Sequence, residues 1–270
     1  MSSMEKLDGL KRRIAERGRI LVSFSGGVDS SLLAKVAHDV LGAGALCAIL
    51  DCETFPRCEL ESARDLARTL GLDLRIARFS ILEDQEFARN PATRCYICKK
   101  RSSQVLKGIA EAEGIACIAD GLNISDYGDY RPGIAACREE GIWHPFVEAK
   151  MTKQDIREIA RDMGLSFWDK PSSACLSSRI PYGERITQDC LMMVEQAEDY
   201  LRSLGYRQLR VRCHGRLARI ELPREDGQKA LARQEEIVAK LKAMGFDYVT
   251  LDLEGFRSGS MNEVLWTSQR

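Results

Sequence analysis

The first part of the chain alternates between short apolar runs and longer segments in which apolar residues recur at helical spacing. These runs predict a buried strand that begins at residue 20 and further strands at 45–50, 74–79 and 115–119. The longer segments predict helices at 7–17, 31–40, 59–70, 93–113 and 153–163. Strands that alternate with helices in this way predict an α/β fold, with a parallel sheet flanked by helices on both faces.

The last third of the chain has a different order of elements. Residues 167–182 lack a regular period and contain Pro171 and Pro181, which predicts a long functional loop. After it we expect a helix, a hairpin around His214-Gly215, another helix and a strand, at 187–204, 208–213, 217–222, 227–244 and 248–253. We therefore predict two domains, 1–183 and a smaller α+β domain at 184–270.

The charge balance and the apolar runs limit the classes of protein to which this chain can belong. The 270 residues include 40 Lys and Arg and 40 Asp and Glu, so the net charge is zero. This balance argues against a general nucleic-acid binder, which carries a basic excess, although it allows a local basic pocket. No apolar run resembles a signal peptide or a membrane span. We therefore expect a cytoplasmic protein.

A glycine turn, SGGVDS at residues 25–30, follows the first predicted strand. Glycine has no Cβ, so Gly26 and Gly27 allow a sharp turn and the close approach of a phosphate. The amides of the turn and of the next helix, with the hydroxyls of Ser25 and Ser30, predict an anion site. No lysine follows the glycines, unlike in G-x-x-x-x-G-K-[ST]. The turn resembles the pyrophosphate-binding loop of the N-type ATP pyrophosphatases, which implies ATP contacts for Ser25, Gly26, Gly27, Val28, Asp29 and Ser30. The alternative is a serine–glycine turn in a protein that binds no nucleotide.

Acidic residues are expected near this turn, because the carboxyl ends of parallel strands meet at one edge of a sheet. Asp29 would repel ATP unless Mg²⁺ neutralised both partners. Asp126 is a second candidate for the same ion, or a turn-forming aspartate. Asp51 could contact the ribose or the adenine; the alternative is a turn residue at the end of a strand. Gly121 lies in the loop 120–126, which should face the nucleotide.

Ten cysteines in a protein expected in the cytoplasm argue against a disulfide framework. Cys47 and Cys117 lie in apolar runs and are expected to be small buried side chains. The following cysteines have no ligand-like spacing, and we assign them no role: Cys52, Cys58, Cys137, Cys190 and Cys213.

Three cysteines remain as candidates for chemistry. Cys95 and Cys98 form a Cys-x-x-Cys, which fits half a zinc site, a redox pair or chance. Cys175 lies between small residues in a proline-containing loop, where Lys170 and Arg179 are expected to favour its thiolate.

Other basic residues suggest anion contacts. Lys99 and Lys100 flank the Cys-x-x-Cys, although at least one of them is expected on a solvated helix face. Arg210 and Arg212 alternate along a predicted strand, so both guanidinium groups lie on one face, which suits a phosphate or is an ordinary polar face. The segment 257–260, Arg-Ser-Gly-Ser, is a further candidate cup for an anion. His38 and His214 are expected to be structural.

Five segments together resemble the LarE family of ATP-dependent sulfur transferases, which build the nickel-pincer nucleotide of lactate racemase. They are SGGVDS, NPATRCYICKK, DGLNISDYGDYRPGIAA, KPSSACLSSRIPYG and LDLEGFRSGSMNE, and the resemblance runs from about Leu10 to about Leu265. It implies adenylation of a carboxylate of pyridinium-3,5-biscarboxylic acid mononucleotide, followed by displacement of AMP by sulfur. It also implies substrate-phosphate contacts near Arg210, Arg212 and Glu221, and a homo-oligomer of six chains.

The resemblance also bears on the sulfur source. One variant of the family keeps only the cysteine that matches Cys175 and sacrifices its sulfur. The other has cysteines matching Cys95, Cys98 and Cys175, which hold a four-iron four-sulfur cluster with one iron open for hydrosulfide. This chain has all three and so resembles the cluster type. A zinc site completed by His144, or three free thiols, is the alternative.

Other functions compete with this one. A tRNA-thiolating ATP pyrophosphatase shares the loop and can share the cysteines, but the neutral charge speaks against it. An amide-forming synthetase would not need three cysteines. A non-catalytic adenine-nucleotide sensor or an iron–sulfur carrier would release no pyrophosphate. The sulfide donor is expected to be a separate partner.

Overall fold

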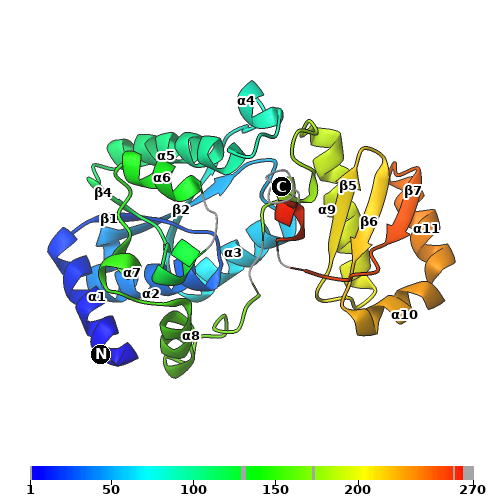
Figure 1. Ribbon diagram of the computed structural model, residues 1–270. Helices are drawn as coiled ribbons and strands as arrows, with labels where there is room; N and C mark the ends of the chain where they lie inside the picture. The colour runs from blue at the N-terminus through cyan, green and yellow to red at the C-terminus, as the bar shows by residue number, and fades with distance from the viewer. Residues whose placement is uncertain (1, 129–131, 172–173, 258, 264–270) are drawn as a thin grey trace. The chain divides into compact units, whose positions relative to one another are not determined.

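The computed structural model describes residues 2–128, 132–171, 174–257 and 259–263. They form two compact units, Met1–Ser80 with Cys95–Ser173, and Ile81–Arg94 with Ala174–Arg270 (Figure 1). The segment 81–94 belongs to the second unit because its backbone bonds to later residues: Ile186 N donates to Ala88 O at 2.8 Å, and Gly183 N to Asn90 O at 2.9 Å. The predicted domain ranges, 1–183 and 184–270, remain a prediction.

The first unit contains a four-stranded parallel sheet in the order β3-β2-β1-β4, which confirms the predicted fold. The strands are β1 Ile20–Ser23, β2 Ala45–Asp51, β3 Asp73–Arg78 and β4 Cys117–Ala119. From β1 the chain adds strands toward one edge and then places β4 on the other side of β1. The order therefore reverses between β1 and β4, which is where ligands bind in sheets of this kind.

Helices cover both faces of this sheet, because successive strand residues point to opposite sides. Val22 and Cys47 contribute to one buried cluster, whereas Leu21 and Leu46 contribute to another. The helices are α1 Ser3–Arg17, α2 Val28–Leu41, α3 Arg57–Thr69, α5 Arg94–Ala112, α6 Gly133–Glu139, α7 Pro145–Glu148 and α8 Lys153–Asp162, with 3-10 turns η1 Gly42–Gly44 and η2 Ile124–Gly128. In Figure 1, α5 and α6 lie on one side of the strands, and α1, α2 and α8 on the other.

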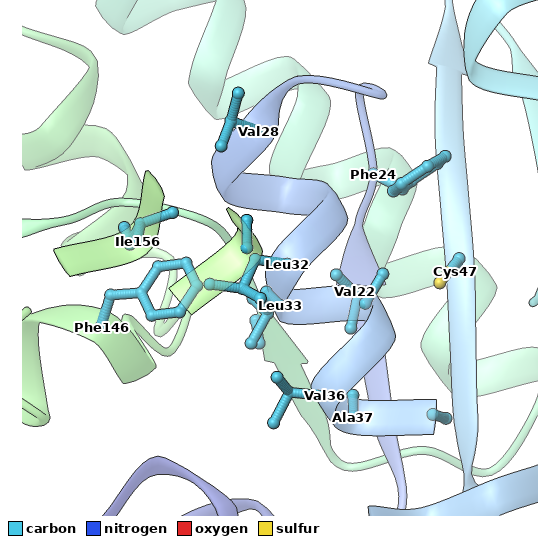
Figure 2. Packing of buried hydrophobic residues seen from close by; sticks show 14 of the residues in the cluster. Val22, Phe24, Val28, Leu32, Leu33, Val36, Ala37, Cys47, Phe146 and Ile156 are labelled. Atoms are coloured by element: carbon cyan, nitrogen blue, oxygen red, sulfur yellow. The ribbon is translucent and has the colours of Figure 1, made fainter. Parts of the chain in front are cut away.

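The larger cluster fixes α2, the helix that follows the glycine turn. Figure 2 shows Leu32 and Leu33 of α2 facing Phe146 of α7 and Ile156 of α8, all of them buried. Thr152 caps α8 as predicted, and its Oγ1 accepts from Asp155 N at 3.3 Å. Because α2 is packed along most of its length, its first turn is held in place next to the glycine turn.

Several predicted boundaries differ from the structure by a few residues, and two of them have a clear physical reason. The helix expected from Ser31 begins at Val28, so Asp29 and Ser30 belong to its first turn. The strand expected from Ile115 begins at Cys117, because Ile115 N instead bonds to Ala110 O at 2.8 Å and closes the end of α5.

The second unit has a three-stranded sheet in the order β5-β6-β7. Strands β5 Arg210–His214 and β6 Leu217–Glu221 form the predicted antiparallel hairpin, and β7 Tyr248–Leu251 runs parallel to β6. The helices are α4 Gln85–Ala88, α9 Gln188–Ser203, α10 Arg224–Ala232 and α11 Gln234–Ala243, with 3-10 turns η3 Leu176–Arg179 and η4 Ser260–Asn262. None of the helices within the described ranges of either unit could cross a membrane.

The single helix predicted at 227–244 is two helices, α10 and α11. The break falls at Arg233, whose φ of −113° and ψ of 21° leave the helical range. Arg233 N bonds to Ala230 O, and the next helix begins with Ile237 N donating to Arg233 O. The sequence contains no glycine or proline at this point, so local patterns gave no sign of the break.

Candidate active site

The glycine turn joins β1 to α2 and depends on the lack of a Cβ at Gly26. Gly26 has φ of +70°, and a Cβ there would lie 2.6 Å from Ala63 Cβ on α3. Lys170 also supports the turn, since its Nζ donates to Gly26 O at 3.2 Å and pairs with Glu59 at 2.8 Å. Gly27 caps α2 without a side-chain bond, which leaves the first amides of the helix open to an anion.

The two serines of the turn bond to each other. Ser25 N donates to Ser30 Oγ at 3.2 Å, and the two hydroxyl oxygens lie 3.1 Å apart. Ser30 Oγ also donates to Gly27 O at 3.2 Å. These bonds stabilise the turn while leaving both hydroxyls beside the space that a phosphate would enter.

A pocket of about 540 Å³ opens at this turn, at the carboxyl ends of β1 and β4. Its size suits a small-molecule ligand. It is lined by Ser23, Ser25, Gly27, Asp29, Ser30, Cys95, Lys99, Asp120, Gly121, Leu122, Asp126, Pro132, Gly133, Ile134 and Cys137. Eight of the predicted site residues are among them, and they come from the turn, from α5 and from the loop after β4.

Other predicted residues of the same unit do not line this pocket. Val28 is 3% exposed and packs in the apolar cluster, as Figure 2 shows. Asp51 is buried at the end of β2 and pairs with Arg57 at 2.6 Å and Arg78 at 3.3 Å. Its charge is thus matched within the fold, which favours the strand-end interpretation of Asp51.

Gly121 brings the loop after β4 against the first turn of α2. A Cβ at Gly121 would lie 2.9 Å from Ser30 N and 3.0 Å from Asp29 C, both backbone atoms that cannot move independently. Glycine at this position therefore allows the loop to close one side of the pocket.

Asp29 has two partners that the sequence did not indicate. Lys153, the first residue of α8, forms an ion pair with Asp29 Oδ2. Asn123 Nδ2 lies 3.4 Å from Asp29 Oδ1. The only local signal for Lys153 was its place after the Thr152 cap, and 124 residues separate it from Asp29 in the chain.

Asp126 Oδ2 accepts from Asn123 N at 2.9 Å and so stabilises the turn before η2. This contact fits the turn-forming interpretation of Asp126, and its carboxylate also lines the pocket beside Asp29.

The pocket contains a partly buried acidic group that sequence reasoning missed. Asp120 Oδ1 lies 2.7 Å from His144 Nδ1. Burial acts to raise the pKa of Asp120, but the hydrogen bond from His144 and the charge of Lys99 hold that pKa below its ordinary value. Beside it, burial raises the pKa of Cys137 to about 11, so this cysteine is a neutral thiol at pH 7.

The three cysteines proposed for sulfur chemistry are divided between the units. Cys95 and Cys98 lie one turn apart at the start of α5 in the first unit, and Cys175 precedes η3 in the second. Within the described ranges no three His, Cys, Asp or Glu side chains are grouped to hold a metal ion. None of the ten cysteines forms a disulfide.

The cations expected beside Cys175 have other partners. The guanidinium of Arg179 pairs with Glu198 at 2.9 Å and donates to Ala174 O at 2.6 Å and to Cys175 O at 3.0 Å. Arg179 therefore holds the backbone of the loop, and Lys170 supports the glycine turn instead. The exposed Cys175 Sγ lies 2.8 Å from Ser177 Oγ.

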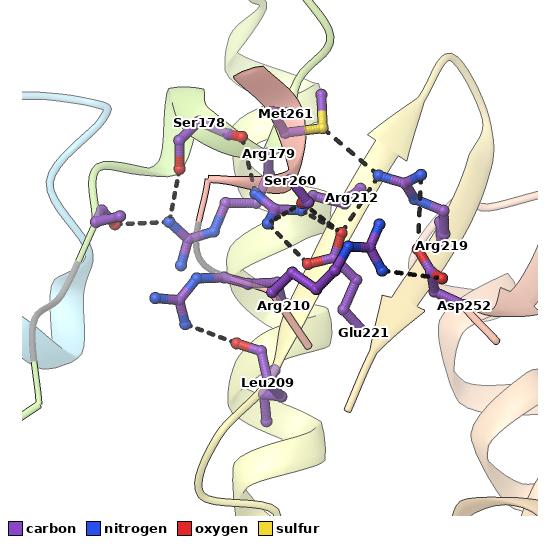
Figure 3. Close-up of polar contacts among 12 residues, drawn as sticks. Ser178, Arg179, Leu209, Arg210, Arg212, Arg219, Glu221, Asp252, Ser260 and Met261 are labelled. Atoms are coloured by element: carbon purple, nitrogen blue, oxygen red, sulfur yellow. Dashed lines mark hydrogen bonds and ion pairs between the residues drawn. The ribbon is translucent and has the colours of Figure 1, made fainter. Parts of the chain in front are cut away.

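Figure 3 shows a cluster of arginines on β5 and β6 of the second unit. Arg212 forms two bonds with Glu221, at 2.9 and 2.7 Å, and donates to Ser178 O at 3.0 Å. Ser260 Oγ donates to the same carboxylate at 2.8 Å. Glu221 is thus the buried anion around which this cluster is organised.

Arg210 differs from its neighbours, because no carboxylate among the described residues pairs with it. Its guanidinium donates to Leu209 O at 2.7 Å and lies 5.2 Å from the centre of the Phe256 ring. Burial, and then the charge of Arg179, lower the pKa of Arg210 to about 10. A partly buried cation of this kind is suited to an anionic ligand.

The anion cup expected at 257–260 is only partly described, since Ser258 lies outside the described residues. Arg257 pairs with Glu254 at 2.8 Å and with Glu263 at 3.1 Å. Ser260 Oγ donates a hydrogen bond to Glu221. The described contacts of this segment are therefore internal to the fold.

We expect Gly26→Ala to lower the free energy of unfolding by about 1–3 kcal/mol, because it adds a Cβ at positive φ against α3. Denaturant unfolding of the whole protein measures this. Gly108→Ala is the matched control: Gly108 lies inside α5 with open space around it, so alanine should raise stability by about 0.5–1 kcal/mol. Equal effects of the two changes would contradict the role assigned to Gly26.

Comparison with known proteins identifies the chain. No known family model matches it. An uncharacterized protein of Synechocystis sp. is 44% identical over 96% of this chain and 98% of its own length. The pyridinium-3,5-bisthiocarboxylic acid mononucleotide synthase of Lactiplantibacillus plantarum is 41% identical over 93% of this chain and 91% of its own length. A subunit of the glutamine-hydrolysing GMP synthase of Methanopyrus kandleri is 27% identical over 60% of this chain and 54% of its own length. The chain therefore belongs to the LarE family of pyridinium-3,5-bisthiocarboxylic acid mononucleotide synthases, within the PP-loop superfamily.

Proposed function

We propose that this protein uses ATP to adenylate a carboxylate of pyridinium-3,5-biscarboxylic acid mononucleotide and then replaces AMP with sulfur, which gives a thiocarboxylate. The name of the 41% identical relative supports this substrate class. The observation that carries the proposal is that the phosphate loop and Cys95 line the same pocket. An activated acyl group and a sulfur ligand would therefore form side by side.

In the first step the substrate carboxylate attacks the α-phosphorus of ATP, and pyrophosphate leaves. The amides of the glycine turn, with Ser25 and Ser30, would bind the departing pyrophosphate at the start of α2. Lys99 extends into the same pocket from α5 and adds a positive charge.

Asp29 and Asp126 supply carboxylate oxygens to one pocket, which suits Mg²⁺ as a hard cation. The ion would neutralise charge on the phosphates when bound. Asn123 holds both carboxylates, through its Nδ2 to Asp29 and its backbone N to Asp126, so the pair is oriented before the metal arrives.

In the second step a sulfur nucleophile attacks the acyl carbon and displaces AMP. Cys95 and Cys98 suit a shared ligand, because residues three apart on a helix lie on the same face. A four-iron four-sulfur cluster held by these two cysteines and Cys175 would supply a bound hydrosulfide, so that the protein is not consumed. Arg179 would hold Cys175 in position through the backbone carbonyls of its loop.

In the second unit, Arg210 would bind the phosphate of the substrate nucleotide. The neighbouring Arg212 is already paired with Glu221, and this pairing orders the strand that carries both arginines. Asp51, Gly26 and Val28 would act indirectly in this scheme, by shaping the turn and its surroundings.

Lys153→Gln should raise the KM for ATP roughly 10- to 100-fold, because charge-assisted hydrogen bonds contribute about 1.5–3 kcal/mol. Without this cation, Mg²⁺ alone would offset the charge of Asp29 beside the phosphates. Pyrophosphate release as a function of ATP, at fixed free Mg²⁺, measures the effect. Lys35→Gln is the control, since Lys35 pairs with Asp39 one turn along α2. An unchanged KM for Lys153→Gln would show that the pair has no part in ATP binding.

The function is tested by incubating purified protein anaerobically with ATP, Mg²⁺, sulfide and pyridinium-3,5-biscarboxylic acid mononucleotide. We expect pyrophosphate release that depends on this substrate, and a product whose mass shows oxygen replaced by sulfur. Pyrophosphate release that instead depends on tRNA and falls steeply with salt would identify a tRNA-thiolating enzyme. Nucleotide binding without pyrophosphate release would identify a sensor.

Two sulfur sources give different protein masses after turnover. Transfer of bound hydrosulfide leaves the polypeptide mass unchanged, whereas sacrifice of Cys175 removes one hydrogen sulfide from it. Iron and sulfide content, with the visible absorption spectrum, separates the cluster from a zinc site. The homo-oligomeric state and cytoplasmic location remain predictions.

A further inference from the structure

Two cysteines that the proposed reaction does not use lie in contact in the second unit. Cys190 is in the first turn of α9, and Cys213 is in β5. Their Sγ atoms are 2.8 Å apart, which is closer than non-bonded sulfurs normally lie and somewhat longer than the disulfide bond of about 2.0 Å. A small displacement of either side chain would therefore bring the two sulfurs within bonding distance.

The two thiols differ in access. Cys213 is 0% exposed and lies in the core between β5 and α9, whereas Cys190 is half-buried and reaches solvent. A soluble oxidant can therefore reach Cys190 first, and Cys213 can react only through its neighbour.

They also differ in acidity. Thr187 caps α9, so the Cys190 thiol lies at the positive end of the helix dipole. A hydrogen bond from Cys213 lowers the pKa of Cys190, although burial opposes it. The same hydrogen bond and burial raise the pKa of Cys213. Cys190 is thus the nucleophile of the pair, and Cys213 is the thiol that remains protonated.

We propose that Cys190 and Cys213 form a reversible intramolecular disulfide, in which Cys190 attacks a small disulfide such as oxidised glutathione and Cys213 resolves the adduct. This site is separate from the three cysteines of the proposed sulfur transfer.

The reaction balances as two thiol–disulfide exchanges. The Cys190 thiolate attacks one sulfur of the oxidant, which breaks its S–S bond and releases one thiol. Cys213 then loses its proton and attacks Cys190 Sγ, which releases the second thiol. The two protein thiols are oxidised, and the oxidant is reduced to two thiols.

The bond would join the first turn of α9 to β5. These two elements hold the arginine cluster, because α9 carries Glu198, the partner of Arg179, and β5 carries Arg212 next to Cys213. Glu198 Oε1 also accepts from Val211 N of β5 at 3.1 Å. Oxidation would therefore add a covalent link to a contact that is already made by polar groups.

The test is to equilibrate the reduced whole protein with glutathione buffers of increasing oxidised fraction, quench it in acid, block remaining thiols with N-ethylmaleimide and digest it with trypsin. Cleavage after arginine gives one peptide of residues 186–202 and another of residues 213–216. We expect the two to appear as a single disulfide-linked species that dithiothreitol separates. Exposed Cys58 reports that the oxidant is active, because it gains glutathione in the same sample. Recovery of both peptides as separate maleimide adducts, while Cys58 is modified, would overturn the proposal.

Two substitutions test the order of attack. Cys213→Ser should accumulate glutathione on Cys190, because the resolving thiol is missing. Cys190→Ser should leave Cys213 unmodified, because it is buried. Two rates are compared: glutathione addition to Cys213 in the Cys190→Ser protein, and formation of the linked peptide in the unaltered protein. If the two rates are equal, Cys213 is the attacking thiol, and the proposed mechanism is refuted. The peptide assay on the unaltered protein decides the existence of the bond even if a variant folds poorly.

Discussion

Replacing Cys175 with alanine should abolish thiocarboxylate formation while pyrophosphate release continues at close to the rate of the unaltered protein. This is the expected result because adenylation needs the glycine turn and the carboxylate substrate, neither of which involves this thiol. The fold should be preserved, since Arg179 holds the loop through the carbonyls of Ala174 and Cys175, which alanine retains. A pyrophosphate assay and the mass spectrum of the nucleotide product, taken from one reaction, measure both steps.

Cys58→Ala is the control for this experiment, because Cys58 is another exposed cysteine and lies in the first turn of α3. It should leave both steps intact. Continued thiocarboxylate formation by Cys175→Ala would remove Cys175 from the mechanism. Loss of pyrophosphate release as well would place Cys175 in adenylation and contradict the separation of the two steps.

Glu221→Ala should lower the free energy of unfolding by about 3–5 kcal/mol, the usual cost of removing one partner from a buried ion pair. Glu221 is 0% exposed and accepts from Arg212, Arg219 and Ser260. Its loss leaves the buried guanidinium of Arg212 without a counter-charge. Denaturant unfolding followed by circular dichroism measures the change.

Glu236→Ala is the matched control, because Glu236 pairs with Arg233 at the surface of α11. Solvent screens this pair, so its loss should be small compared with that of Glu221. Equal losses in the two variants would show that the Arg212–Glu221 pair does not organise the second unit. Because the arginine cluster depends on Glu221, we also expect Glu221→Ala to weaken binding of the substrate nucleotide.

The sequence alone determined the alternation of strands and helices in the first unit. The strands β1 and β2 read as short apolar runs, and most of the flanking helices have an apolar stripe and a glycine just after their last residue, so these signals are local. The hairpin of β5 and β6 was also predictable, because it closes around His214-Gly215. The family resemblance, likewise, rested on short contiguous segments.

Local patterns failed where the backbone depended on distant contacts or on a single residue. The break at Arg233 has no glycine or proline to mark it. The assignment of 81–94 to the second unit rests on bonds to residues about 90 positions later, such as that from Asn90 Nδ2 to Pro181 O at 2.7 Å. No periodicity within 81–94 could have indicated this partner.

The sequence also identified the chemical types in the active site, namely the glycine turn, the carboxylates and the three cysteines. Only the tertiary structure decided which of them share a pocket. Cys95 and Lys99 lie beside the phosphate loop, and Asp29 pairs with Lys153. Asp51 pairs with two arginines and does not line the pocket. Cys190 contacts Cys213. The physical reason is that charge pairing and sulfur contacts act over a few ångströms in space. Strand order and helix packing set those distances, even between residues as far apart in the chain as Asp29 and Lys153.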